Sequence, residues 1–313
     1  MKFYFAPLEG VTGYIYRNAH HAFFGQIGKY FTPFISPTSN NVFTSRELND
    51  ILPEHNEGLP VVPQILTNNS EHFIRTMDHL ANLGYDEINL NLGCPSGTVV
   101  AKHKGSGFLA QKEQLDKFLE DIFSKSLIKI SIKTRIGKDS PDEFYELIEI
   151  FNRYPLEELI IHPRIQTDFY RNNVNKTVFR DALALSKNPI CYNGDIFNVN
   201  DYKELLEMFP SLDAVMLGRG LIGNPALIGQ IKNNHAIDKQ TIKAFHDSIC
   251  AGYQQILSGD KNVLFKMKEI WFYMIHLFAE SDKYLKKIRK ANRLGDYELV
   301  ISELFQELDI VET

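Results

Sequence analysis

One pattern recurs through roughly the first three-quarters of the sequence: a short apolar run rich in β-formers, then a longer stretch with apolar residues at helical spacing. The runs that we expect to be strands are residues 3–6, 30–35, 61–66, 87–92, 129–134, 159–162, 190–193 and 214–217. About eight strands alternating with helices over about 230 residues is typical of a (β/α)8 TIM barrel. A doubly wound parallel sheet is the alternative that the same alternation allows.

One of the helical stretches has a recognisable start. Ser140 is expected at its N-cap, with Pro141 in the first turn and Glu143 three residues later, which is a capping box. The buried stripe that should follow consists of Phe144, Leu147, Ile148 and Phe151.

The β pattern stops after about residue 234, and only helical periodicity follows. We therefore expect a barrel domain over residues 1–234 and a small helical domain over 235–313. The segment 283–290 is strongly basic, with Arg293 just beyond it. Such a run is either a solvated helix face or a patch that binds an RNA backbone, and both interpretations remain open.

The composition is that of an ordinary soluble globular protein. The 313 residues are 44% hydrophobic and 23% charged, and their net charge of −5 does not suggest a general nucleic-acid binder. We expect no signal peptide, because the apolar run between Lys2 and Glu9 is too short for one, and no membrane span, because the longest apolar run, 270–275, is far below spanning length. Cys94, Cys191 and Cys250 are odd in number and widely spaced, so we expect no disulfide framework, no metal site and a reducing cytoplasm.

The clearest chemical signal is the stretch 91–96, Asn-Leu-Gly-Cys-Pro-Ser. It ends an apolar strand in which Asn89 and Asn91 share one face, since strand side chains alternate with period two. Pro95 restrains Cys94 to an extended backbone. A thiol at the carboxyl end of a strand, beside amides, is placed for chemistry, whereas an isolated buried cysteine would act as core filling.

Functional residues of such barrels lie where the strands end. The polar residues near the predicted strand ends are Glu9, Gln64, Asn91, Cys94, Lys133, Arg135, His162, Asn193, Asp195 and Arg219. Lys133 and Arg135 point to the same side of one strand. Two cations held together in a barrel mouth favour an anionic ligand, and surface charges on a frayed strand end are the alternative.

Two loops with glycines follow the last two predicted strands, where many barrels bind phosphate. They are 193–196, Asn-Gly-Asp-Ile, and 218–223, Gly-Arg-Gly-Leu-Ile-Gly. The second has the spacing of a dinucleotide fingerprint, but that fingerprint opens a βαβ unit, and here the β pattern ends. We expect instead that backbone amides approach a phosphate there. A similar stretch, 105–110, is expected to shape the loop that holds Cys94.

Together these residues indicate a family. The motifs in chain order are 6–12 (Ala-Pro-Leu-Glu-Gly-Val-Thr), 91–96, Lys133-Thr134-Arg135, His162-Pro163-Arg164, 193–196 and Gly218-Arg219-Gly220. In their order and their spread over almost the whole predicted barrel, they resemble the tRNA-dihydrouridine synthases, flavoproteins that reduce a uridine in tRNA. Each motif alone is weakly specific, whereas the set is highly specific.

The resemblance implies FMN at the barrel mouth, tRNA as substrate and NADPH or NADH as the external reductant. The residues that it assigns to the cofactor are Pro7, Leu8, Glu9, Gln64, Lys133, His162, Asn193, Gly194, Asp195, Gly218 and Arg219. It assigns Asn91 and Arg135 to the uracil, and Cys94 to protonation of C5 after hydride transfer from flavin N5 to C6. A thiol with an unperturbed pKa of about 8.5 is mostly protonated near neutral pH, which suits a proton donor.

Departures from the family pattern leave the target uridine open. Gly13 replaces a usual aspartate, Phe108 a small residue, Ile165 a common threonine and Asp168 a common glutamine. Two other functions remain open as well: an FMN barrel that reduces a free pyrimidine or another small unsaturated substrate, and an RNA-binding protein that has lost catalysis. The sequence indicates no obligatory protein partner and is compatible with a monomer.

Overall fold

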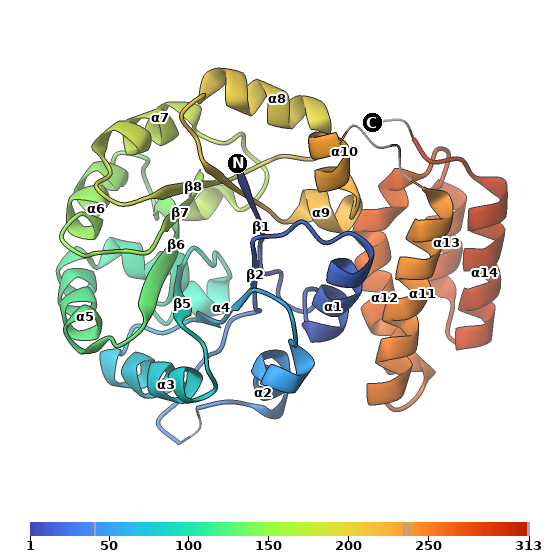
Figure 1. Ribbon diagram of the computed structural model, residues 1–313, viewed down its shortest axis with the longest axis horizontal. Coiled ribbons are helices and arrows are strands. Elements are labelled where there is room, and N and C mark those ends of the chain that lie inside the picture. The colour runs from blue at the N-terminus through green and yellow to red at the C-terminus, as the bar shows by residue number, and fades with distance from the viewer. Residues whose placement is uncertain (41, 234–235, 237, 312–313) are drawn as a thin grey trace. The chain divides into compact units, whose positions relative to one another are not determined.

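A computed structural model describes residues 1–40, 42–233, 236 and 238–311. The chain folds as a TIM barrel followed by C-terminal helices (Figure 1). Its strands are β1 (Lys2–Phe5), β2 (Lys29–Phe31), β3 (Val61–Val62), β4 (Gln64–Ile65), β5 (Glu87–Leu92), β6 (Lys129–Gly137), β7 (Leu159–Ile165), β8 (Ile190–Asn193) and β9 (Ala214–Leu217). They form one parallel sheet in the order β3-β2-β1-β9-β8-β7-β6-β5-β4.

The two ends of this sheet are consecutive in the sequence, which is why nine strands make an eight-membered barrel. β3 pairs with β2, β4 pairs with β5, and only Pro63 separates them. Proline lacks the N–H that a strand ladder needs, so the run predicted as one strand at 61–66 is divided in two. The prediction of a TIM barrel is confirmed, and the doubly wound alternative is wrong.

Sequence periodicity placed the central strands well. β5, β8 and β9 have the predicted bounds, and all six residues of β5 are buried, as expected for a strand covered on both faces. β6 and β7 run three residues further than predicted, to Gly137 and Ile165, whereas β2 ends earlier, at Phe31. The extensions matter for the site because they lengthen the strands that carry Arg135 and His162.

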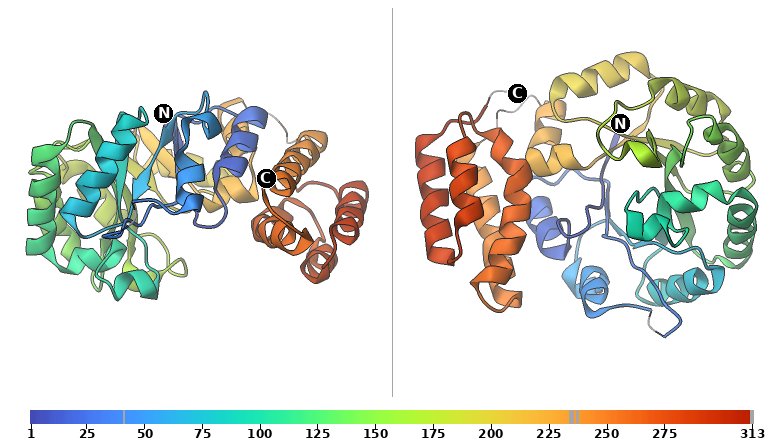
Figure 2. Two further views of the ribbon diagram at one scale, coloured as in Figure 1. Left: turned by 90° about the horizontal axis from the view of Figure 1, so that it is seen from below. Right: turned by 180° about the vertical axis from the view of Figure 1, so that it is seen from behind.

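The chain divides into two compact units. Unit 1 comprises residues 1–7, 28–194 and 209–216, and it holds nearly the whole sheet. Its helices are α2 (Ser45–Ile51), α3 (Ser70–Asn82), α4 (Gly97–Val100), α5 (Lys112–Lys125), α6 (Glu143–Phe151) and α7 (Lys176–Leu185), with 3-10 turns at Pro53–His55, Gly105–Ala110 and Gln166–Asp168. Figures 1 and 2 show α3, α5, α6 and α7 around the outside of the strands.

Helix α6 begins later than predicted. Asp142, not Ser140, occupies the N-cap position, and its side chain makes no capping hydrogen bond. The Glu143 carboxylate instead accepts hydrogen bonds from the backbone N–H groups of Lys138, Asp139 and Ser140, each at 2.8 Å. Glu143 therefore binds backbone N–H groups of the preceding loop, as the acid of a capping box does. Ser140, in contrast, does not cap the helix.

Unit 2 comprises residues 8–27, 195–208 and 217–313. Its helices are α1 (Tyr14–Phe23), α8 (Val199–Met208), α9 (Arg219–Gly223), α10 (Leu227–Asn233), α11 (Lys239–Ile256), α12 (Asp260–Met274), α13 (Asp282–Lys290) and α14 (Leu294–Glu307), with a 3-10 turn at Ile275–Leu277. Among the described residues, no helix is both long enough and apolar enough to cross a membrane.

Helices α11 to α14 pack around buried aromatic residues. The Tyr297 hydroxyl lies at their centre, 2.6 Å from His246 Nε2, and accepts a hydrogen bond from Trp271 Nε1 at 2.7 Å. Helix α1 joins this unit through the Tyr16 ring, which packs edge-on against Phe245. The predicted domain boundary falls between residues 234 and 235, which lie outside the described residues, and it stays a prediction.

Candidate active site

A row of buried polar side chains crosses three neighbouring strands of unit 1. The strand register aligns Gln64 of β4 with Asn89 of β5, and Asn89 with Ser131 of β6. Gln64 Nε2 donates to Asn89 Oδ1 at 2.8 Å, and Asn89 Nδ2 donates to Ser131 Oγ at 2.9 Å. All three side chains are fully buried, so each needs the partners that the row provides.

Cys94 is held in a turn that adjoins this row. Asn91 Oδ1 accepts hydrogen bonds from the backbone N–H groups of Gly93 and Cys94, at 3.0 and 2.9 Å, and Asn91 Nδ2 donates to Gln64 Oε1 at 2.7 Å. The amide of Asn91 thus fixes the backbone that carries the thiol. Cys94 is partly exposed, whereas Cys191 and Cys250 are buried.

The stretch 105–110 shapes this turn, as predicted. The Cys94 carbonyl oxygen accepts hydrogen bonds from both the backbone N–H and the hydroxyl of Ser106. Gly105 has φ +56°, and a Cβ placed there would lie 2.8 Å from the Cys94 carbonyl oxygen. Only glycine fits that position without displacing the cysteine.

Lys133 of β6 lies beside Asn91 in the register. Desolvation by the surrounding protein, and secondarily the charge of Arg135, lowers the pKa of Lys133 to about 8. A bound anionic or carbonyl-rich group would favour the charged form of this ammonium group. A lysine pKa lowered in this way is typical of a catalytic or ligand-binding position.

Arg135 has more protein partners than the sequence suggested. Its Nε donates to the Gly93 carbonyl at 3.0 Å, and its two terminal nitrogens donate to the carbonyls of Ile165 and Phe169, at 2.8 and 2.7 Å. The side chain is 1% exposed, and its guanidinium lies over the Tyr170 ring. Arg135 therefore ties the turn of Cys94 to the loop after β7, and contact with a uracil stays a prediction.

His162 of β7 is buried and belongs to a second polar group. Its Nε2 lies 2.9 Å from Arg164 NH1, and its ring stacks on Tyr170. A guanidinium can only donate, so Nε2 is the acceptor and the imidazole carries its proton on Nδ1. His162 thus offers an N–H donor, a suitable group for an anion, although its assignment to a phosphate stays a prediction.

Asn193 ends β8, and Gly194 follows it within unit 1. Asn193 Nδ2 donates to the Met216 carbonyl at 2.8 Å, which links β8 to β9. A Cβ at Gly194 would lie 2.3 Å from the Tyr192 hydroxyl, so this glycine is needed for packing. Pro7, also in unit 1, follows β1 and is partly exposed.

The remaining predicted cofactor residues lie in unit 2. Leu8 starts a tight turn: its N–H donates to Thr12 Oγ1 at 2.8 Å, and its carbonyl accepts from Val11 and Thr12. Lys266 of α12 donates to the Gly10 carbonyl of the same turn at 2.7 Å, while Glu9 is exposed.

Arg219 pairs with Asp195 inside unit 2. Arg219 NH2 lies 2.6 Å from Asp195 Oδ1, and the guanidinium lies over the Phe197 ring. Gly218 is the N-cap residue of α9, and a Cβ at Gly220 would lie 2.0 Å from the Ile196 carbonyl oxygen. Gly220 therefore allows two loops to pack closely, and the phosphate roles of Asp195, Gly218 and Arg219 stay predictions.

Sequence reasoning missed several residues that organise this site. Glu87 and Ser131 continue the polar row, Arg164 binds His162, and Gln166 Nε2 donates to the Pro95 carbonyl at 3.2 Å. Glu87 was within reach, because it precedes Asn89 and Asn91 at the same two-residue period. Arg164 stands in the motif His162-Pro163-Arg164 at the same two-residue period, but no role was predicted for it. The contacts of Ser131 and Gln166 depend on which strands and loops become neighbours.

A parallel barrel that presents a thiol, a row of amides and two cations near the ends of neighbouring strands has the layout of a TIM-barrel enzyme. Residues 4–308 match the family model described as Dihydrouridine synthase (Dus), and the chain belongs to this family.

Named relatives agree with this family. A protein of Vibrio parahaemolyticus named tRNA-dihydrouridine(16) synthase is 24% identical over 324 residues, which cover 94% of this chain and 93% of the relative. One of Rickettsia bellii named probable tRNA-dihydrouridine synthase is 31% identical over 181 residues, covering 56% of this chain and 55% of its own.

Solved structures support the fold alone. Morphinone reductase aligns with a TM-score of 0.53 and 12% identity, over 77% of this chain and 88% of its own. A variant of NCR from Zymomonas mobilis aligns with a TM-score of 0.55 and 14% identity, over 78% of this chain and 90% of its own.

Proposed function

We propose that this protein is a tRNA-dihydrouridine synthase that uses FMN to reduce a uridine of tRNA to 5,6-dihydrouridine, with NADPH as the external reductant. The observation that carries the proposal is the fixed position of Cys94. The thiol lies just after the carboxyl end of β5, its backbone is held by Asn91 and Ser106, and it interacts electrostatically with Lys133 of β6.

The donor set in unit 1 is chemically suited to a flavin. A flavin ring presents carbonyl oxygens and ring nitrogens along its pyrimidine edge, and its reduced form is anionic. Lys133, whose pKa is lowered to about 8 by desolvation, gains a counter-charge from such a ring. We assign Gln64 and Lys133 to the ring, and His162, Asn193 and Gly194 to the more distant part of the cofactor.

The unit 2 residues are assigned to FMN by the family motifs. Leu8 and Glu9 continue the segment that begins at Pro7, and Asp195, Gly218 and Arg219 are assigned to the phosphate. The pairing of Arg219 with Asp195 supports a preorganised guanidinium, because its orientation is fixed before any ligand binds.

When bound, the flavin would supply a hydride from N5 to C6 of the uracil. The protein's part is to place the base and to complete the reduction with a proton at C5. We assign the proton to the thiol of Cys94 and the orientation of the base to Asn91 and Arg135. Arg135 would orient the base both by direct contact with it and by holding together the Cys94 turn and the loop after β7.

The base must leave its stack to reach such a site, which costs a few kcal/mol. Relatives named for uridine 16 make that position the first to examine in this protein. An absorbance spectrum of the purified protein gives the first test: flavin bands should bleach with NADPH and return faster with tRNA that lacks dihydrouridine. Absence of flavin after reconstitution would overturn the cofactor assignment.

The role of Cys94 has its own test. Cys94→Ala should retain bound flavin and its bleaching by NADPH, and should lose dihydrouridine formation. Cys250→Ala removes a buried thiol of the helical bundle and serves as the matched control, with both properties retained. Normal dihydrouridine formation by Cys94→Ala would rule out the thiol as the proton donor.

A further inference from the structure

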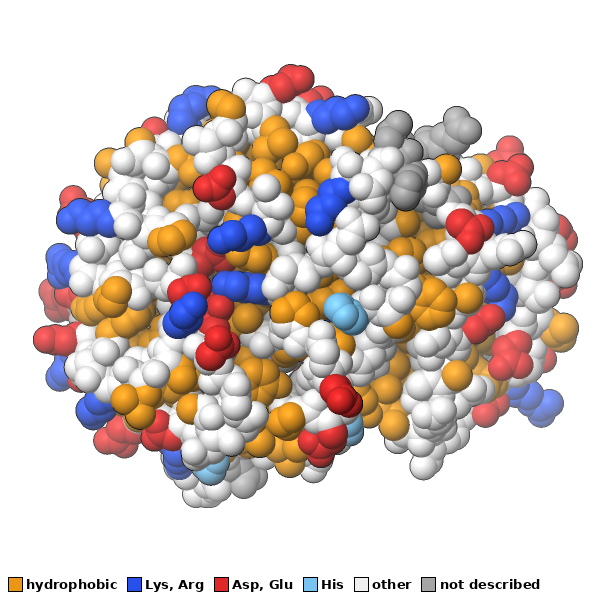
Figure 3. All heavy atoms as spheres, viewed as in Figure 1, with side chains coloured by type: hydrophobic (Ala, Val, Ile, Leu, Met, Phe, Trp, Pro, Cys, Tyr) orange, Lys and Arg blue, Asp and Glu red, His pale blue; other side chains and the backbone are white. Residues whose placement is uncertain are grey.

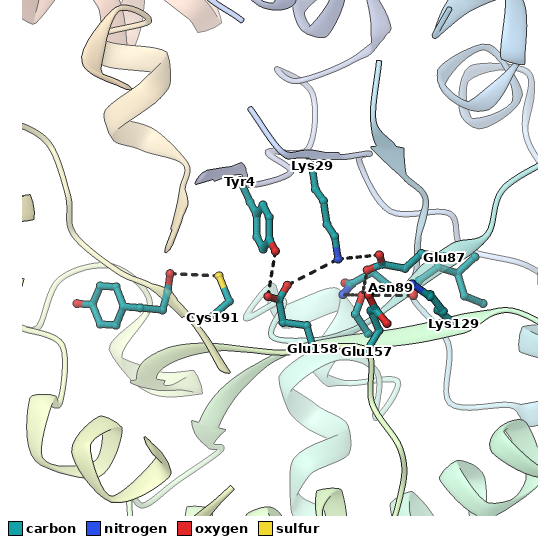
Figure 4. Close-up of polar contacts among 11 residues, drawn as sticks. Tyr4, Lys29, Glu87, Asn89, Lys129, Glu157, Glu158 and Cys191 are labelled. Atoms are coloured by element: carbon teal, nitrogen blue, oxygen red, sulfur yellow. Dashed lines mark hydrogen bonds and ion pairs between the residues drawn. The ribbon is translucent and has the colours of Figure 1, made fainter. Parts of the chain in front are cut away.

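A continuous chain of hydrogen bonds runs through the interior of unit 1, from the Cys94 turn to a carboxylate near the start of β5. It passes through Asn91, Gln64 and Asn89 to Ser131, as described above. Ser131 Oγ then donates to Glu87 Oε1 at 2.8 Å. Figure 4 shows Asn89 and Glu87 among the polar residues of this region.

The carboxylate end of the chain is anchored by an ion pair. Glu87 Oε2 lies 2.7 Å from Lys29 Nζ, and the side chain of Glu87 is nearly inaccessible to solvent. Lys29 lies between Glu87 and Glu158, and the Tyr4 hydroxyl donates to Glu158 at 3.0 Å (Figure 4). A carboxylate paired in this way can only accept hydrogen bonds.

The acceptor at one end determines the direction of every bond in the chain. Because Glu87 only accepts, the Ser131 hydroxyl must donate to it, and Ser131 Oγ is then the acceptor for Asn89 Nδ2. Asn89 consequently presents its oxygen to Gln64, which must donate through Nε2. Gln64 is left with its oxygen toward Asn91, whose Nδ2 donates.

The other end independently requires the same direction. The backbone N–H groups of Gly93 and Cys94 can only donate, so the Asn91 oxygen must face them. Reversing any single amide would bring two donors or two acceptors together at two contacts, in a region where Gln64, Asn89 and Ser131 are fully buried. The two ends agree on one orientation for all three amides.

We propose that Glu87 and Ser131 are positioning residues that fix the amide orientation of Gln64 and Asn91, and thereby the geometry of the Cys94 turn and the hydrogen-bonding groups shown to flavin and uracil. The last part, concerning flavin and uracil, rests on the function proposed above. Neither Glu87 nor Ser131 touches the reacting atoms; both act through the amides.

Two variants of Ser131 separate this role from simple packing. Ser131→Thr and Ser131→Val add the same volume on the inner face of β6, and only threonine keeps a hydroxyl that can accept from Asn89 and donate to Glu87. Any effect of the added bulk is therefore common to both. Each variant is purified with its flavin and compared with the wild type for flavin content, thermal stability and the rate of flavin reoxidation by tRNA after reduction with NADPH.

We expect Ser131→Val to lower the tRNA-dependent reoxidation rate per bound flavin by about tenfold relative to Ser131→Thr, since small misplacements at a reacting centre have effects of this size or larger. Reduction by NADPH should change less. A lower flavin content or melting temperature in Ser131→Val, with equal reoxidation rates per bound flavin, would assign Ser131 a structural role only and overturn the proposal.

A second readout needs neither flavin nor tRNA. Cys94 is the partly exposed thiol, so alkylation by iodoacetamide, corrected with Cys94→Ala, reports on its turn. Ser131→Val should be alkylated about threefold faster than Ser131→Thr, because one net hydrogen bond changes a local equilibrium by a factor of this order. Equal alkylation rates would overturn the proposal even if the wild type reduced no tRNA, whereas a wild type without flavin activity would overturn only the proposed function.

Discussion

The carbonyl oxygen of Cys94 accepts two hydrogen bonds from one residue, Ser106: one from its hydroxyl at 2.8 Å and one from its backbone N–H at 3.1 Å. Asn91 binds the N–H of Cys94 from the strand side. Both backbone groups of the cysteine are thus fixed, one by the strand before it and one by the 3-10 turn after it. The position of the thiol depends on a loop 12 residues away in sequence as much as on its own strand.

Gly105→Ala should displace this turn. Gly105 has φ +56°, and a new Cβ would lie 2.8 Å from the Cys94 carbonyl oxygen and 3.0 Å from its Cβ. We expect a loss of about 2–4 kcal/mol in the free energy of unfolding, from the left-handed backbone and the clash together, measured by urea denaturation.

Gly58→Ala is the matched control for that experiment. Gly58 has φ +74°, but a Cβ added there would meet no described atom within 4 Å, so the substitution carries the backbone strain without the clash. It should be destabilised by about 1 kcal/mol and keep its dihydrouridine formation. If both variants lost the same free energy of unfolding, the contact with Cys94 would not contribute to the destabilisation of Gly105→Ala.

Lys133 should destabilise the flavin-free protein at neutral pH. Its pKa is lowered to about 8, so near pH 7 the folded state must hold an ammonium group in a desolvated position. The loss of unfolding free energy from this buried charge is complete below about pH 8 and decreases as the pH rises. It disappears above about pH 10.4, the pKa of lysine in the unfolded chain.

Lys133→Met should therefore raise the free energy of unfolding of flavin-free protein at pH 7 by about 1–3 kcal/mol, and by less at pH 9.5. The same variant should bind flavin weakly. Lys129→Met, at the exposed start of the same strand, should change neither property. A Lys133→Met variant that is less stable than the wild type at pH 7 would contradict the assigned desolvation.

Glu158 should make stability fall as the pH rises through neutrality. Burial raises the pKa of Glu158 to about 7, against the opposing effects of Lys29 and the Tyr4 hydroxyl. Its Oε2 accepts no hydrogen bond from the described residues and lies 3.9 Å from Lys29 Nζ, so the ionised form is only partly compensated for its burial. The folded state binds the proton more tightly than the unfolded state, so this contribution is fully present below about pH 4.5 and is lost as the pH rises through 7.

Glu158→Gln should flatten the dependence of unfolding free energy on pH between 5 and 8, with a change of about 1–2 kcal/mol across that window. The amide can still accept the hydrogen bond from Tyr4. Glu157→Gln alters the neighbouring carboxylate, which pairs with Lys129 nearer the surface, and should leave the slope unchanged. An unchanged slope in Glu158→Gln would exclude Glu158 as the titrating group.

Local sequence pattern was sufficient to predict the barrel and the place of the Cys94 thiol at the end of a strand. Period-two alternation placed Asn89 and Asn91 on one face, and the glycine spacing of 105–110 predicted a loop around Cys94. The role of Ser131 could not be predicted, because it follows from the register between β5 and β6, which no local pattern encodes. Arg135 illustrates the same limit: its three carbonyl partners come from segments 42, 30 and 34 residues away.

In the basic helix α13, part of the positive charge that the sequence shows is neutralised by neighbouring acidic side chains. Two of its cations are paired with acidic residues of α14: Lys287 Nζ lies 2.8 Å from Glu303, and Lys283 Nζ lies 3.3 Å from Glu307. Figure 3 accordingly shows blue and red side chains interspersed over the helical bundle. Lys286 and Arg289 are exposed, and no side-chain ion pair is found for either within the described part of the chain.

If α13 binds an RNA backbone, Lys286 and Arg289 should carry most of the affinity. Replacing both by glutamine should weaken tRNA binding about tenfold at moderate salt, without changing flavin content or melting temperature. It should also reduce the slope of log affinity against log salt concentration by about 1–2, since a protein that neutralises fewer phosphates releases fewer counterions on binding.

Replacing Lys283 and Lys287 by glutamine removes the same formal charge from the same helix and is the matched control. Because Glu307 and Glu303 already compensate these two lysines, their replacement should affect tRNA affinity less and melting temperature more. Equal affinities of the wild type and the Lys286 and Arg289 double variant at every salt concentration would show that α13 is a solvated face, and the tRNA would then have to bind through other residues.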